Sequence, residues 1–162
     1  MKLLMDADCL IKLTKSNLKE LVCECFSIII PQNVQEEVIK NTEEYPDATI
    51  IKENIEKNLL VVNRQICSSQ KGEDAVFTLF KQEKYDAICS DDKRFIKRLR
   101  LFNIPYITPS VFIAILLKNG KLTLKEAYQK LNSLSLFISD DEYQAIVMVL
   151  KNWSTYNEDK NY

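Results

Sequence analysis

The sequence predicts an α/β protein with a mainly parallel sheet. Short apolar runs alternate along the 162 residues with longer stretches in which apolar residues recur every three or four positions. Runs of the first kind are typical of strands buried on both faces, and stretches of the second kind are typical of helices. This alternation indicates strand–helix–strand units, which build a parallel sheet covered by helices. One domain over residues 1–156 is expected, with a disordered tail at 157–162.

The first half of the chain contains three predicted strands. An apolar run at residues 3–5 precedes a helix that Asp8 is expected to cap, and a helix over 18–25 leads to a strand at 27–30 that Pro31 ends. Further helices are expected from Asn33 and over residues 46–55, and they are followed by the third strand at 59–62.

The second half continues the alternation. A loop at 68–72 precedes a helix over 73–84, and a strand at 86–89 leads into a basic helix over 93–101. The last strand, 104–107, contains a proline, which favours an edge position. Two or three helices complete the chain: Asn119-Gly120 is expected to stop one, Thr123 to cap the next, and the acids after Ser139 to cap a late one.

Composition excludes several classes of function. The net charge is −1, so only a local basic patch could bind a polyanion. With two glycines, the chain has no glycine-rich phosphate loop and no dinucleotide fingerprint. Its five cysteines lack the spacing of a disulfide framework or a zinc site, which favours reduced thiols in the cytoplasm. No apolar run is long enough to span a bilayer, so no membrane partner is expected.

Acidic residues directly follow the predicted strands. Asp6 follows the first strand and Asp92 follows the strand at 86–89. Because ligands of open α/β sheets bind at the carboxyl ends of strands, these acids are expected to share one site. Histidine is absent from the chain, so carboxylates must carry most acid–base or metal chemistry.

Acids stand beside apolar structure at four places, which pair Asp6 with Asp8, Glu37 with Glu36, Asp74 with Glu73, and Asp92 with Asp91. Clustered carboxylates raise each other's pKa, and a divalent cation relieves that repulsion. Ligation by oxygen alone selects Mg²⁺ or Mn²⁺, which activate water and steady the charge on a phosphate. Metal-dependent phosphodiester hydrolysis is therefore chemistry that these side chains can perform.

Four segments resemble, in order, the motifs of PIN-domain nucleases. They are Leu3-Leu4-Met5-Asp6-Ala7-Asp8-Cys9-Leu10-Ile11, Pro31-Gln32-Asn33-Val34-Gln35-Glu36-Glu37-Val38, Gly72-Glu73-Asp74-Ala75-Val76 and Ser90-Asp91-Asp92-Lys93-Arg94-Phe95. The resemblance implies a PIN-like three-layer α/β/α fold with a five-stranded sheet in the order 3-2-1-4-5.

It also implies a catalytic pocket of Asp6, Glu37, Asp74 and Asp92. Asp6, Asp74 and Asp92, together with the additional acid Asp91, are the expected ligands of Mg²⁺ or Mn²⁺ in a metal-dependent ribonuclease. The family includes VapC-like toxins, so RNA is the expected substrate and an antitoxin protein an expected partner, as in a toxin–antitoxin pair.

Two assignments of metal ligands stay open. The helical wheel places Glu73 nearer the apolar stripe than Asp74, whereas motif spacing favours Asp74. Whether Asp91 or Asp92 is the metal ligand is also open, and both could serve only to cap the following helix, although one cap does not require two acids.

A basic cluster follows Asp92. Lys93, Arg94 and Lys97 are expected to guide an RNA backbone, although a solvated helix face is the usual explanation for such a run. Three aromatics beyond it are expected in the core, namely Phe102, Tyr106 and Phe112.

Two other functions stay open. The segment around Asp6 also resembles the nucleophile motif of haloacid-dehalogenase-like phosphatases, although Leu10 stands where that family has Thr or Val. A catalytically decayed PIN-like module that binds RNA or protein is the second alternative. A homodimer is compatible with either.

Overall fold

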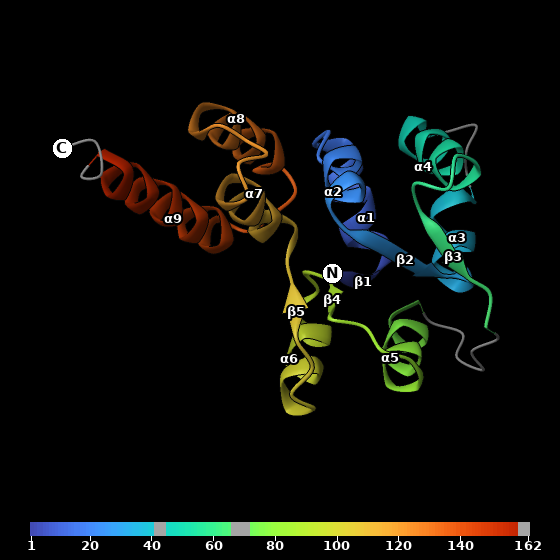
Figure 1. Cartoon of the computed structure of the whole chain (residues 1–162). Helices are drawn as coiled ribbons and strands as arrows, with labels where there is room; N and C mark the ends of the chain where they lie inside the picture. Colours follow the sequence, from blue (N-terminus) through green and yellow to red (C-terminus); the bar gives the residue numbers. More distant parts are fainter. Residues whose placement is uncertain (41–44, 66–71, 159–162) are drawn as a thin grey trace. The chain divides into compact units, whose positions relative to one another are not determined.

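The computed structural model describes residues 1–40, 45–65 and 72–158 (Figure 1). Its five strands are β1 (Lys2–Met5), β2 (Ser27–Pro31), β3 (Val61–Asn63), β4 (Ala87–Cys89) and β5 (Tyr106–Ile107). They form one sheet in the order β3-β2-β1-β4-β5, and all four pairings are parallel. The predicted α/β class and the strand order 3-2-1-4-5 are confirmed.

Helices follow the strands along the chain. They are α1 (Ala7–Lys15), α2 (Lys19–Cys25), α3 (Gln32–Ile39), α4 (Pro46–Glu56), α5 (Gly72–Gln82), α6 (Lys93–Leu101), α7 (Pro109–Lys118), α8 (Leu124–Leu134) and α9 (Asp140–Glu158).

The chain divides into two compact units. The first, Met1–Thr108, contains the sheet with α1 to α6, and the second, Pro109–Tyr162, contains α7 to α9. The boundaries of a single domain over 1–156 stay a prediction. Residues 159–162 of the expected tail lie outside the described residues, as does the expected loop at 68–72 except for Gly72, which begins α5.

The two central strands explain where the acids lie. Leu3 and Leu4 of β1 and Ile88 of β4 are fully buried, as expected for strands covered on both faces. Met5 is in register with Cys89, and the Asp6 amide donates to the Cys89 carbonyl at 3.1 Å. The residues that follow β1 and β4 therefore emerge side by side at the carboxyl edge of the sheet.

The cap of α1 differs from the prediction. Asp6, not Asp8, is the N-cap: its backbone is extended and its carboxylate accepts a hydrogen bond from the Cys9 amide. The chain turns from β1 into the helix within one residue, so Asp8 falls in the first helical turn. The prediction of Asp8 as the cap was wrong by this shift of two residues.

The predicted helix signals at Gly120 and Thr123 in the second unit are confirmed. Gly120, at φ 68°, ends α7, and its amide donates to the Leu117 carbonyl. Thr123 and Glu126 form a capping box at the start of α8. Glu142 was expected only as a cap. Its amide donates to the Ser139 hydroxyl at 3.3 Å, and its carboxylate accepts a 2.6 Å hydrogen bond from the Ser110 hydroxyl, which links α9 to α7.

The described residues also bear on the predictions about the cysteines and about membrane-spanning segments. Cys9, Cys23, Cys25 and Cys89 are free thiols, whereas Cys67 lies outside the described residues. None of the described helices combines the length and the apolar character needed to cross a membrane.

Candidate functional site

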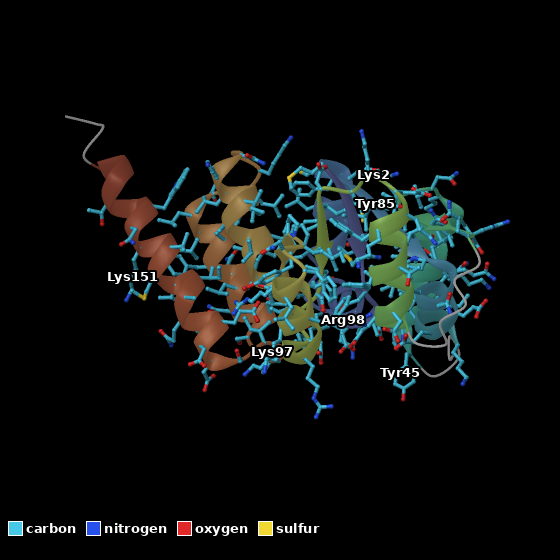
Figure 2. All side chains as sticks on the ribbon, turned by 90° about the horizontal axis from the view of Figure 1, so that it is seen from below. Lys2, Tyr45, Tyr85, Lys97, Arg98 and Lys151 are labelled. Carbon is cyan, nitrogen blue, oxygen red and sulfur yellow. The ribbon has the colours of Figure 1, made fainter. Side chains whose placement is uncertain are left out.

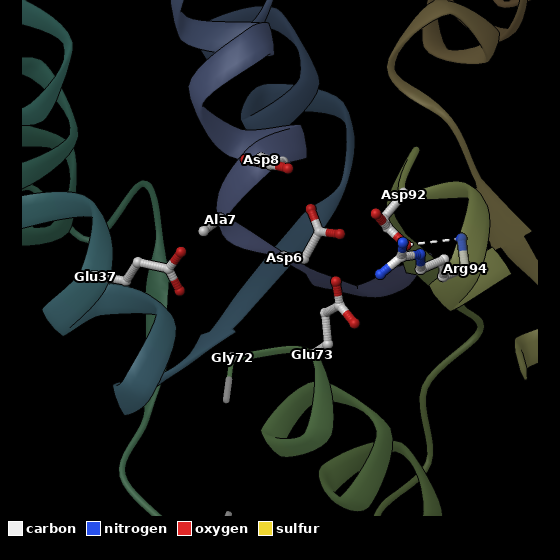
Figure 3. A pocket seen from close by; sticks show the side chains of 8 residues that line it. All are labelled: Asp6, Ala7, Asp8, Glu37, Gly72, Glu73, Asp92 and Arg94. Atoms are coloured by element: carbon white, nitrogen blue, oxygen red, sulfur yellow. Dashed lines mark hydrogen bonds between the residues drawn. The ribbon is translucent and has the colours of Figure 1, made fainter. Parts of the chain in front are cut away.

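A pocket of about 510 Å³ lies in the first unit at the carboxyl edge of the sheet (Figure 3). Four of the five acids that line it come from separate segments: Asp6 follows β1, Glu37 lies on α3, Glu73 lies in the first turn of α5 and Asp92 precedes α6. The remaining lining residues are Ala7, Asp8, Gly72 and Arg94. Four parts of the chain that are distant in sequence thus meet at one negatively charged concavity.

Asp6 is the most deeply buried acid of the pocket, with 4% of its surface exposed. Burial, the largest effect, raises its pKa from an ordinary 3.8 to about 7. The negative charges of Asp91 and Asp8 raise the pKa further, whereas hydrogen bonds from the Ser90 side chain and the Cys9 amide lower it. The folded protein therefore destabilises the charged form of Asp6, which a cation in the pocket would stabilise.

Asp92 combines helix capping with a place in the pocket wall. Its Oδ1 atom accepts hydrogen bonds from the amides of Arg94 and Phe95 at 2.8 and 2.7 Å. Both bonds end on the same oxygen, so Oδ2 is available to a ligand. Asp92 therefore caps α6 and also lines the pocket.

Ser90 connects the two acids that follow the central strands. It is fully buried, its hydroxyl accepts a hydrogen bond from the Asp92 amide at 3.2 Å, and its side chain hydrogen-bonds Asp6. Sequence reasoning missed this residue. The available signal was its position, because Ser90 follows β4 as Asp6 follows β1.

Glu37 lies against the start of α5. Burial raises its pKa, and the charge of Asp8 raises it further. A Cβ atom at Gly72 would stand 2.9 Å from the Glu37 Oε2 atom and 3.4 Å from Val34. The absence of a side chain at Gly72 thus leaves the Glu37 carboxylate its place in the pocket.

Asp74 and Asp91, two of the predicted metal ligands, are absent from the pocket wall. Asp74 forms an ion pair with Arg98 on α6, and Asp91 forms one with Lys12 on α1, each with an N–O distance of 2.5 Å. Glu73, the alternative to Asp74, lines the pocket instead. The metal-binding roles of Asp74 and Asp91 stay predictions.

Of the predicted RNA-guiding residues, Arg94 lines the pocket, whereas Lys93 and Lys97 are exposed on α6 and are absent from the pocket wall. Figure 2 labels Lys97. The structure therefore gathers Asp6, Glu37, Asp92 and Arg94 from the predicted set. It adds Asp8 and Glu73, the sequence neighbours of two predicted acids.

The pocket suits a hard divalent cation by the type of its donors. Every potential ligand is a carboxylate oxygen, and oxygen ligands are those preferred by Mg²⁺ and Mn²⁺. Within residues 1–40, 45–65 and 72–158, no three acidic or thiol side chains stand in positions that could hold an ion together. Binding would thus require the carboxylates to close in on the cation.

Comparison with known proteins agrees with this geometry. The family model described as PIN domain matches residues 2–152, and PIN domains are typically nucleases that bind divalent metals and often act on RNA. No curated protein and no solved structure matches the chain. Because the family match covers nearly the whole sequence, the chain belongs to the PIN-domain family.

Proposed function

We propose that the chain is a Mg²⁺- or Mn²⁺-dependent endoribonuclease. The observation that carries this proposal is the convergence of Asp6, Glu37, Glu73 and Asp92 on one pocket with Arg94 in its wall. Acids held this way cost stability unless a cation compensates them, because burial and like charge oppose their ionisation. A phosphodiester group is the anion that such a cation and Arg94 could hold together.

Each residue has a definite task in this proposal. Asp6, Glu37, Glu73 and Asp92 would hold the cation, with Glu73 in the place predicted for Asp74. Arg94 binds a non-bridging oxygen of the phosphate, while Lys93 and Lys97 contact neighbouring phosphates of the strand. A bound Mg²⁺ or Mn²⁺ lowers the pKa of water and steadies the charge that develops on the phosphate. In the hydrolysis, the oxygen of water joins phosphorus, one P–O bond breaks and the departing oxygen gains a proton.

Asp6 links metal binding to protonation. With a pKa of about 7, its carboxyl carries a proton in a large fraction of molecules at neutral pH when no cation is bound. A cation must displace that proton, so metal affinity should rise as pH rises through about 7. This behaviour would distinguish binding at Asp6 from loose association with the protein surface.

The test combines Mn²⁺ titration calorimetry with cleavage of labelled single-stranded RNA. The wild type should bind Mn²⁺ and cleave RNA only when the metal is present. Asp6→Asn should reduce the cleavage rate by more than about a hundredfold, because even residues that only hydrogen-bond to metal ligands contribute about ten- to hundredfold to activity. Asp141→Asn, in the second unit, is the matched control and should cleave normally. Failure of the wild type to bind Mn²⁺, or full cleavage by Asp6→Asn, would refute the proposal.

Further experiments address the other expectations. Attachment of a phosphate-mimicking fluoride to Asp6 would favour the phosphatase alternative, and RNA binding without metal binding would favour a decayed module. An antitoxin partner and a homodimer stay predictions, and the mass of the complex purified from its native cells would test both. The toxin role rests on family membership alone.

A further inference from the structure

An exposed aromatic ring stands among cations at the far end of α6. Phe102 directly follows α6 and is 53% exposed, although the sequence predicted it in the core. Its ring packs edge-on against buried Phe77 of α5, with centroids 5.1 Å apart and an interplanar angle of 73°. The prediction of a core position for Phe102 was wrong: of the two rings, only Phe77 is buried.

Two cations surround this ring pair. The Lys81 ammonium lies 4.4 Å from the centroid of Phe102 and 4.8 Å from that of Phe77, and the Arg98 guanidinium lies 4.0 Å from the Phe77 centroid. Asp74 holds Arg98 in this position through their ion pair. We define these four residues, Phe77, Lys81, Arg98 and Phe102, as the aromatic–cation patch.

We propose that the aromatic–cation patch binds an unpaired nucleotide of a single-stranded RNA, with a base stacked on Phe102 and its phosphates near Lys81 and Arg98. An exposed ring beside cations offers the two contacts that proteins use for single-stranded nucleic acids, namely stacking and phosphate neutralisation. A solvent-exposed Phe alone is an ordinary feature of proteins, whereas its combination with two cations matches a polyanion with flat bases.

The position of the patch relative to the pocket supports the same ligand. Arg94 lines the pocket, and Phe102 follows it by eight residues along α6, a rise of about 12 Å at 1.5 Å per residue. This distance corresponds to roughly three to four stacked nucleotides at about 3.4 Å each. Lys97 and Arg98 lie between the two points, so a strand could run along α6 over a basic surface.

This inference deepens the proposed function, because it assigns the patch to nucleotides flanking the cleaved phosphate. It also gives Asp74 a positioning role, in which its carboxylate keeps Arg98 over the Phe77 ring. The aromatic contact predicts a requirement for bases, which phosphate contacts by themselves do not impose.

The test measures binding in EDTA, where cleavage cannot contribute. Fluorescence anisotropy would compare a labelled oligoadenylate of about 12 nucleotides with an abasic strand of equal length, for the wild type and Phe102→Leu. The variant should bind the oligoadenylate at least about fivefold more weakly, from the usual contribution of a stacked base, and the abasic strand equally well. Phe102→Trp, which keeps an aromatic ring at this position, should bind the oligoadenylate as tightly as the wild type does.

Leu101→Ala is the matched control, because Leu101 is the adjacent residue and is 76% exposed. It should bind both strands as the wild type does. Equal affinities of Phe102→Leu and wild type for oligoadenylate would overturn the inference, and so would equal losses on both strands or an equal loss in Leu101→Ala. Loss of a co-purifying protein by Phe102→Leu, with RNA binding intact, would overturn it in favour of a protein contact.

The outcome is independent of the proposed nuclease activity. A base-dependent loss in Phe102→Leu, combined with no metal-dependent cleavage by the wild type, would refute the endoribonuclease and support the nucleotide site. Metal-dependent cleavage by the wild type, combined with unchanged binding by Phe102→Leu, would support the endoribonuclease and refute the nucleotide site.

Discussion

The pocket at the carboxyl edge and a second polar cluster of the same unit treat their carboxylates in opposite ways. In the pocket, burial and neighbouring acids raise the pKa values of Asp6 and Glu37. In the second cluster, which we call the Glu83 network, hydrogen bonds from Tyr85 and Asn63, and the nearby Lys2, lower the pKa of Glu83.

The difference lies in the hydrogen-bond donors around each carboxylate. Glu83 accepts hydrogen bonds from Tyr85 at 2.8 Å, Gln65 at 2.8 Å, Asn63 at 3.1 Å and Lys2 at 3.3 Å, and the Lys2 ammonium also lies over the Tyr85 ring. The Glu83 carboxylate thus obtains its hydrogen-bond donors from the protein itself. In the pocket, the surroundings instead oppose the ionisation of Asp6 and Glu37, which is typical of functional sites.

Asp6→Asn should produce the largest effect on stability. A pKa raised from 3.8 to about 7 means that protonated Asp6 contributes about 4 kcal/mol more to the free energy of unfolding than ionised Asp6 does. In the metal-free wild type this contribution is fully present below the unfolded pKa, and it is lost as pH rises through about 7, because the folded protein then carries a buried charge. Asn keeps the N-cap hydrogen bond without the charge.

Without divalent cations at about pH 8, Asp6→Asn should therefore unfold at a temperature about 10 °C higher than the wild type. Differential scanning calorimetry from about pH 4 to 8 measures this, and the gap should close at the acid end. Glu83→Gln is the control and should show no stabilisation at any pH in that range. A Tm for Asp6→Asn below that of the wild type at about pH 8 would contradict the account of Asp6.

The second test compares neighbours on α5. Glu73→Gln should weaken Mn²⁺ binding by about tenfold or more, because Glu73 lines the pocket. Asp74→Asn should change Mn²⁺ affinity far less, since the Asp74 carboxylate is paired with Arg98. Titration calorimetry of both variants measures the difference. The reverse order of affinities would restore Asp74 as the ligand that motif spacing predicted.

The chain's two glycines provide a third test. Gly72→Ala places a Cβ atom against Glu37 Oε2, the far end of a flexible side chain, so the fold should persist while Mn²⁺ affinity falls severalfold. Gly120→Ala should do the opposite: it should cost about 1 kcal/mol, because Gly120 has a positive φ, and leave Mn²⁺ affinity unchanged. Calorimetric titration and thermal unfolding of both variants would separate these effects. Unchanged affinity in Gly72→Ala would remove Glu37 from the ligand set.

These tests concern the places where sequence reasoning was weakest. The sheet was predictable because buried parallel strands leave local apolar runs, as at β1 and β4. Pro105 correctly indicated that the last strand lies at an edge, although it directly precedes β5 and does not lie within it as predicted. The choice between Glu73 and Asp74 depends on the rotation of α5 against the sheet. Helical periodicity indicated this rotation by placing Glu73 nearer the apolar stripe, whereas motif spacing contains no information on it. Asp91 lies between β4 and α6, and its partner Lys12 lies on α1, so the pairing joins distant parts of the chain and leaves no pattern in the sequence.

Exposure was equally hard to predict. Phe102 and Phe112 are alike in type, yet the first is 53% exposed and the second is fully buried. Phe102 stands where α6 ends, so the helical period that places Phe95 and Leu99 inside does not continue through it.

The smallest expected effect lies inside the Glu83 network. Burial, the larger cause, and the hydrogen bond to Glu83 raise the pKa of Tyr85 to about 12. Glu83→Gln removes the negative charge, so the Tyr85 pKa should fall, although it should stay above 10 because burial persists. NMR titration of labelled tyrosine would measure it, with the exposed Glu24→Gln as control. A Tyr85 pKa unchanged by Glu83→Gln would mean that burial acts alone, and the Glu83 network would then no longer serve as an internally completed counterpart to the pocket.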